Sequence, residues 1–92
     1  MKFSAGKSAS GRFEAGDILV VPVSSFVPYP SFFRVDPDEL THSISLRALG
    51  SAKTAAGYIP DSHEYHTSIC NPSEGYVNTW CGKAMLWDGV PC

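Results

Sequence analysis

The most constraining feature of the sequence is a strict alternation of side chains over residues 40–48, LTHSISLRA. Every second position holds a residue that can be buried, and these positions are Leu40, His42, Ile44, Leu46 and Ala48. Because successive side chains of an extended strand point to opposite faces, a period of two predicts a half-buried β-strand. Serine and threonine are weak helix formers and fill most of the intervening positions, which disfavours a helix.

Proline and glycine punctuate the rest of the chain. Seven prolines and eight glycines in 92 residues leave little room for long helices and favour short strands joined by turns. A chain of this length supports one domain with one small core. The sequence therefore predicts an all-β fold over residues 17–92, a small antiparallel sheet or sandwich that includes a C-terminal hairpin.

Several further strands and turns follow from local composition. Residues 18–23 form a β-branched run in which Pro22 predicts an edge strand or a bend. In residues 26–35, Pro28 and Pro30 predict an extended segment along a sheet edge. Pro37 predicts a turn in residues 36–40, and the small residues 50–57 predict a loop. A last short strand is expected over residues 83–87, with a closing turn after it.

The predicted hairpin pairs residues 63–70 with residues 75–81 through the connection 71–75. Placing Cys70 opposite Tyr76 puts His66 opposite Trp80 on the same face. The other face pairs Ile69 with Val77 and Tyr65 with Cys81, and its composition predicts the core side.

Residues 1–16 are predicted to be a flexible, basic N-terminal arm. The arm contains Lys2, Lys7 and Arg12 among serine, alanine and glycine, a composition too poor in apolar residues to order itself. It has no apolar run of the kind that a signal peptide needs, and no segment has the length of a membrane span. We therefore expect cytoplasmic synthesis and no membrane partner.

Charge and cysteine content exclude two further classes. A formal net charge of -2 with no basic run argues against nucleic acid as a partner. Three cysteines, an odd number, in a chain without a predicted signal peptide favour reduced thiols over a disulfide framework.

Residues 61–70, DSHEYHTSIC, raise the question of a metal site. The candidate zinc ligands are His63, His66, Cys70 and Cys81. Zinc needs about four ligands that converge on one point, and the predicted hairpin sends the two histidines, and likewise the two cysteines, to opposite faces. We therefore predict no metal and no cofactor. In this interpretation His63 and Glu64 are solvated loop residues and His66 stacks on Trp80.

Nothing in the sequence predicts catalysis. Cys70 lies four residues from His66 in a predicted strand, about 13 Å away at ~3.3 Å per residue, too far for a nucleophile and its base to pair. No phosphate-binding loop, serine-nucleophile motif or HExxH motif occurs. The acidic turn DPDE lacks the flanking ligands of a calcium loop. The expectation is a protein that is not an enzyme.

Aromatic content is the feature that suggests binding. The chain has five phenylalanines, four tyrosines and two tryptophans, more than a single small core easily covers, and exposed aromatic surface commonly marks a contact site. Together with the three basic residues of the arm, the predicted partner-binding residues are Tyr29, Phe32, Phe33, His66, Tyr76, Trp80 and Trp87.

The function that these features favour is that of a structural subunit, a homo-oligomer held in a larger symmetric assembly by protein–protein contacts. A virion component, such as a capsid decoration, minor capsid or tail protein, would fit this class. The alternatives are a small carbohydrate-binding module that uses Trp80 and Tyr76, which would make a glycan the partner, and a small zinc-binding domain.

Overall fold

The structure is a computed structural model that describes residues 13–23, 27–37, 44–70, 72–73 and 75–92. These residues form strands, turns and extended segments and contain no helix, so the predicted all-β fold is confirmed. The strands are β1 (Ile18–Val21), β2 (Ser31–Pro37), β3 (Ile44–Thr54), β4 (Gly57–Cys70), β5 (Pro72–Ser73), β6 (Tyr76–Thr79) and β7 (Gly82–Leu86). Within these ranges, therefore, no helix could cross a membrane.

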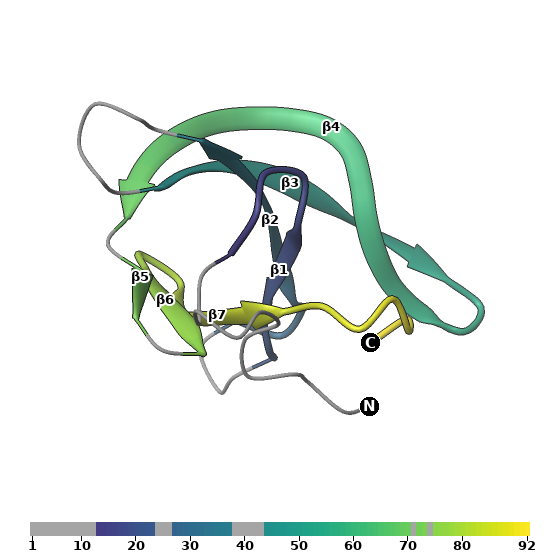
Figure 1. Ribbon diagram of the computed structural model, residues 1–92. Helices are drawn as coiled ribbons and strands as arrows, with labels where there is room; N and C mark the ends of the chain where they lie inside the picture. The colour runs from purple at the N-terminus through teal and green to yellow at the C-terminus, as the bar shows by residue number, and fades with distance from the viewer. Residues whose placement is uncertain (1–12, 24–26, 38–43, 71, 74) are drawn as a thin grey trace.

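The strands form one strongly curved antiparallel sheet in the order β4-β3-β2-β1-β7-β6-β5. β1 pairs with β2, β2 with β3 and β3 with β4, and β7 returns to pair with β1. The two edges of the sheet are β4, the longest strand, and β5, which has two residues. Figure 1 shows β4 arching over the rest of the molecule and ending above β5 and β6.

The main core lies on one face of this sheet. Cross-strand pairing aligns Leu19, Phe33 and Ala48 across β1, β2 and β3, and residues aligned in this way share a face. The buried members of the cluster are Phe13, Leu19, Val21, Phe33, Val35, Leu46, Ala48, Cys70, Val77 and Ala84. The alternation predicted around Leu46 and Ala48 is thus confirmed, because the side chains between them leave the core; residues 40–43 lie outside the described range.

A second, smaller apolar cluster lies on the opposite face. Val20 and Phe32 are opposed across β1 and β2 and are fully buried, although their neighbours in sequence point into the main core. The ring of Trp87 covers Phe32 edge-on, with 5.6 Å between ring centroids. Trp87, the first residue of a folded-back segment 87–92, therefore covers this second cluster.

Residues 87–92 are fastened to the start of β4. The backbones of Tyr58 and Cys92 exchange two hydrogen bonds, with N to O distances of 3.1 and 2.9 Å. The neighbouring Gly57 has φ +133°, and a Cβ at this position would lie 2.7 Å from the carbonyl oxygen of Cys92. Only glycine allows both the backbone angle and the close approach.

Several predicted elements are corrected by non-local pairing. The segment that contains Pro30 was expected at a sheet edge, but β2, which begins after Pro30, is an interior strand. Residues 18–23 were expected to form an edge strand or to bend at Pro22; β1 is an interior strand, and it ends before Pro22. Asp36 and Pro37 are the last two residues of β2, and the rest of the turn expected over residues 36–40 lies outside the described range. The expected loop 50–57 belongs mostly to β3. Phe13, assigned to the arm, is buried in the core, whereas residues 1–12 lie outside the described range.

The predicted hairpin register is also wrong. Residues 57–70 pair with β3, with Ile44 opposite Cys70, and the hairpin is made instead by β5 and β6, with Ser73 opposite Tyr76. The expected core side is wrong for β4, where Cys70 is buried whereas Tyr65 and Ile69 are exposed, but it is right for Val77 of β6, which is fully buried. His63 and Glu64, predicted in a loop, lie within β4.

Candidate interaction surface

β4 passes close to β6 without pairing with it, and we call this unpaired contact the seam. Across the seam the rings of His66 and Trp80 stack at 4.8 Å between centroids with an interplanar angle of 33°. The stacking predicted from the sequence is therefore present, although the hairpin from which it was derived does not exist.

Trp80 is positioned by a tight turn between β6 and β7. The hydroxyl of Thr79 donates to the carbonyl of Gly82 at 2.8 Å and accepts from the backbone N–H of Cys81 at 3.1 Å. The indole then lies edge-on against the buried ring of Phe33, 5.1 Å between centroids, and remains 53% exposed. Trp80 thus has one side on the core and the other side in solvent.

The edge strand β4 continues this surface. Its pairing with β3 has two irregularities, between Arg47 and Leu49 and between Leu49 and Ser51, which bend the strand. Pairing is regular from Thr67 to Cys70, where Ile69 is 60% exposed. The end of β4 that follows the seam is therefore regular in register and carries an exposed apolar side chain, and among the described residues it has a strand neighbour on one side only.

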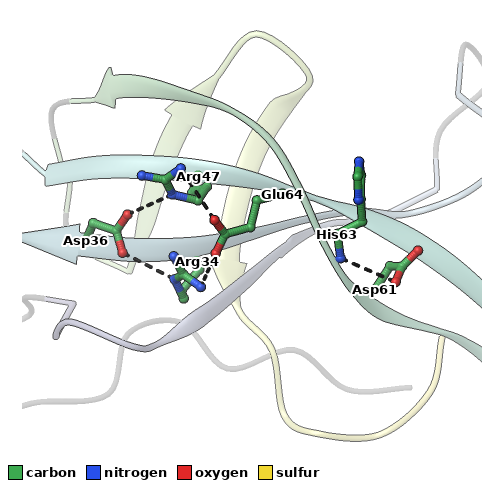
Figure 2. Close-up of polar contacts among 6 residues, drawn as sticks. All are labelled: Arg34, Asp36, Arg47, Asp61, His63 and Glu64. Atoms are coloured by element: carbon green, nitrogen blue, oxygen red, sulfur yellow. Dashed lines mark hydrogen bonds and ion pairs between the residues drawn. The ribbon is translucent and has the colours of Figure 1, made fainter.

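Four charged side chains form a closed network on β2, β3 and β4 (Figure 2). Asp36 contacts the Nε atoms of Arg34 and Arg47 at 3.3 Å each. Glu64 bridges the same two guanidinium groups on the other side, at 3.4 Å from Arg47 and in closer contact with Arg34. Hydrogen bonds to Asp36 and Glu64 raise the pKa of Arg34. The network balances its own charges, so it does not attract a charged partner.

The sequence did not predict this network. Arg34 and Arg47 are opposed in the ladder, but that opposition depends on the β2–β3 register, and Glu64 arrives through the irregular part of β4. The only hint of the network in the sequence was that Arg47 occupies a polar, outward-facing position in the alternating pattern of residues 40–48. The side chains of each pair are about one third exposed, so solvent screening keeps the contribution of each pair to stability small.

The other predicted partner-binding residues differ in burial and in the contacts that they make. Phe32 and Phe33 are buried, so the prediction that their side chains contact a partner is corrected. Tyr76 is half-buried, and the ammonium of Lys83 lies 4.7 Å from its ring centroid, so Tyr76 does not extend the exposed face of Trp80. Trp87 covers Phe32 and donates its indole N–H to the carbonyl of Val90 at 2.9 Å. Tyr29 is half-exposed, and Lys2, Lys7 and Arg12 lie outside the described residues.

The four candidate zinc ligands are not brought together. His63 packs edge-on against Tyr65, His66 stacks on Trp80, and Cys70 is buried in the core cluster. Over the described parts of the chain, no three side chains of histidine, cysteine, aspartate or glutamate are grouped in a way that could hold a metal ion. What this surface offers is aromatic stacking, apolar contact and an open strand edge.

Cys70 should be protected from alkylation in the folded chain. Its side chain is 7% exposed, and burial raises the pKa of its thiol, so the reactive thiolate is scarce at neutral pH. Brief iodoacetamide treatment followed by peptide mass analysis should label the half-buried Cys81 and Cys92 before Cys70, and unfolding should expose all three. Equal labelling rates in the native chain would show that Cys70 is not in the core.

Comparison with known proteins provides no relative from which a role could be transferred: no family model, curated protein or solved structure matches the chain.

Proposed function

We propose that this chain is a non-enzymatic assembly subunit that binds further copies of itself through protein–protein contacts in a symmetric homo-oligomer. The observation that carries the proposal is the surface formed by Trp80, His66 and the open edge of β4 from Thr67 to Cys70, named here the seam surface. Large aromatic side chains with one buried and one exposed side are typical anchors of protein interfaces.

A second copy of the chain is the occupant that this surface favours. A strand edge has unpaired N–H and C=O groups that add readily to another strand, and proteins that do not use such edges usually blunt them with lysine or proline. From Thr67 to Cys70 the edge has neither residue, and Ile69 stands exposed beside it. A two-fold axis perpendicular to this strand would pair the edge with the same edge of a second copy in antiparallel orientation.

The first twelve residues would extend the same contact. They precede Phe13, which is buried in the core, so they start from a fixed point on each subunit. In the proposed assembly Lys2, Lys7 and Arg12 lie along the neighbouring copy, which adds buried area that a chain of 92 residues cannot generate alone. A virion component, such as a capsid decoration, minor capsid or tail subunit, is the finer role that we propose within this class.

Ile69→Lys tests the seam surface. A charged side chain at the open edge should raise the dissociation constant of the assembly roughly 10- to 100-fold, as measured by analytical ultracentrifugation over a dilution series. The monomer should keep its melting behaviour within about 0.5 kcal/mol, because Ile69 is exposed in the single chain.

Val90→Lys is the matched control for this change. Val90 is similarly exposed but lies in the folded-back segment 87–92, away from the edge of β4 that follows the seam, so its substitution should leave association unchanged. If Ile69→Lys assembles as strongly as the Val90→Lys control, the edge of β4 is not the interface.

A further inference from the structure

Three of the four tyrosines of the chain gather around a pocket that is separate from the seam surface. Tyr29 precedes β2, Tyr58 lies at the start of β4, and Tyr65 lies in the irregular part of β4. The pocket has a volume of about 400 Å³, at the lower end of the range of small-ligand sites, and Ser31, Gly50 and Ser51 complete its main lining.

The walls of this tyrosine pocket are held in place by packing. The ring of Tyr65 lies so close to Gly50 that a Cβ added there would be 3.2 Å from both its hydroxyl oxygen and a ring carbon. The imidazole of His63 packs edge-on against the Tyr65 ring, 4.8 Å between centroids. Tyr65 therefore contacts a neighbouring histidine and lies close to the backbone of Gly50, next to Asp61, while remaining 62% exposed.

The segment that carries Tyr29 is fixed in the same way. The hydroxyl of Ser51 donates to the carbonyl of Pro30, which ties the residues before β2 to β3. Pro30 itself is fully buried, whereas the adjacent Tyr29 is 49% exposed. The opening is thus flanked by two half-exposed phenol rings on anchored backbone, which limits the entropy lost when a ligand binds.

The chemistry of the lining selects a class of ligand. None of the residues that line the pocket carries a carboxylate, ammonium or guanidinium group, so a charged ligand would lose its hydration without gaining an ion pair. A purely apolar ligand would leave the phenol groups and the hydroxyl of Ser31 without partners, whereas Ser51 already donates to Pro30. A pyranose ring matches both requirements, since its C–H face can lie on an aromatic ring while its hydroxyls bond to the polar rim.

We propose that the tyrosine pocket binds one neutral sugar residue, with Tyr29 and Tyr65 as stacking walls and Ser31 and the phenol groups as hydrogen-bonding partners. This site differs from the one that the sequence suggested for a glycan, because Tyr76 is engaged with Lys83 and Trp80 lies at the seam. It is also independent of assembly, since its stacking walls are not part of the seam surface.

Titration of the isotope-labelled full chain tests this site. Glucose, galactose, mannose and N-acetylglucosamine are added separately while the backbone amide signals are followed by NMR. At least one sugar should produce saturable shifts centred on Gly50 and Ser51. Tyr65→Ala should weaken that binding about tenfold or more with the melt unchanged, because the side chain is mostly exposed.

Tyr76→Ala is the matched control, since Tyr76 is the one tyrosine outside the pocket, and it should bind the sugar as the unaltered chain does. Three results overturn the proposal: no saturable shift with any of the four sugars, shifts centred on Trp80 instead of Gly50, or saturation by a polyproline peptide without a response to sugar. The last result would make the pocket a peptide groove.

Discussion

Replacing Phe33 with alanine should lower the free energy of unfolding by about 3–5 kcal/mol. Phe33 is 1% exposed, lies opposite Leu19 and Ala48 in the two neighbouring strands and supports the ring of Trp80. Truncation leaves a cavity that the curved sheet cannot close. Because a domain of this size has only about 5–15 kcal/mol of stability in total, guanidinium denaturation should show a large fall in the midpoint.

Phe33→Leu is the control for this change. Leucine restores most of the buried volume, so its cost should be about 1–2 kcal/mol. A Phe33→Ala chain that unfolds within 1 kcal/mol of the unaltered chain, as estimated from the same curves, would place Phe33 on the surface, where the sequence alone had suggested it.

Trp80→Ala should separate folding from association. Loss of an interface anchor should cost about 2–4 kcal/mol of association free energy, measured by sedimentation over a dilution series. The monomer should lose only about 1–2 kcal/mol, because Trp80 is half-exposed and only one edge of its ring covers Phe33.

Trp80→Phe separates the contribution of this side chain to folding from its contribution to association. A phenyl ring can still lie on Phe33, so the monomer should melt close to the unaltered chain, while association should recover only in part because the contact area is smaller. If Trp80→Ala assembles fully, Trp80 is a cover for the core and not an interface anchor.

Local patterns predicted only those features that a single strand determines. The alternation through Leu46 and Ala48 was readable because one face of β3 is buried, which imposes a period of two. The edge or interior position of a strand was not readable, since it depends on which distant segments pair. The return of β7 to β1, which makes β1 interior, has no local sequence signal.

Proline was the residue most often misread. Pro60 lies inside β4, beside one of the two irregularities in its pairing with β3, and is tolerated because β4 is an edge strand. Pro37 ends β2 where its last cross-strand pair is formed. The contact between His66 and Trp80 was predicted from an incorrect register. It occurs because β4 passes over the turn after β6, so proximity arises from the curvature of the sheet and not from a ladder.

Native mass spectrometry of the unaltered full chain is the most direct test of self-assembly through the seam surface. The account predicts a dominant oligomer, with a mass two or more times the 9.9 kDa mass of one chain, that dissociates on dilution. A single 9.9 kDa species at every concentration up to the solubility limit would contradict it.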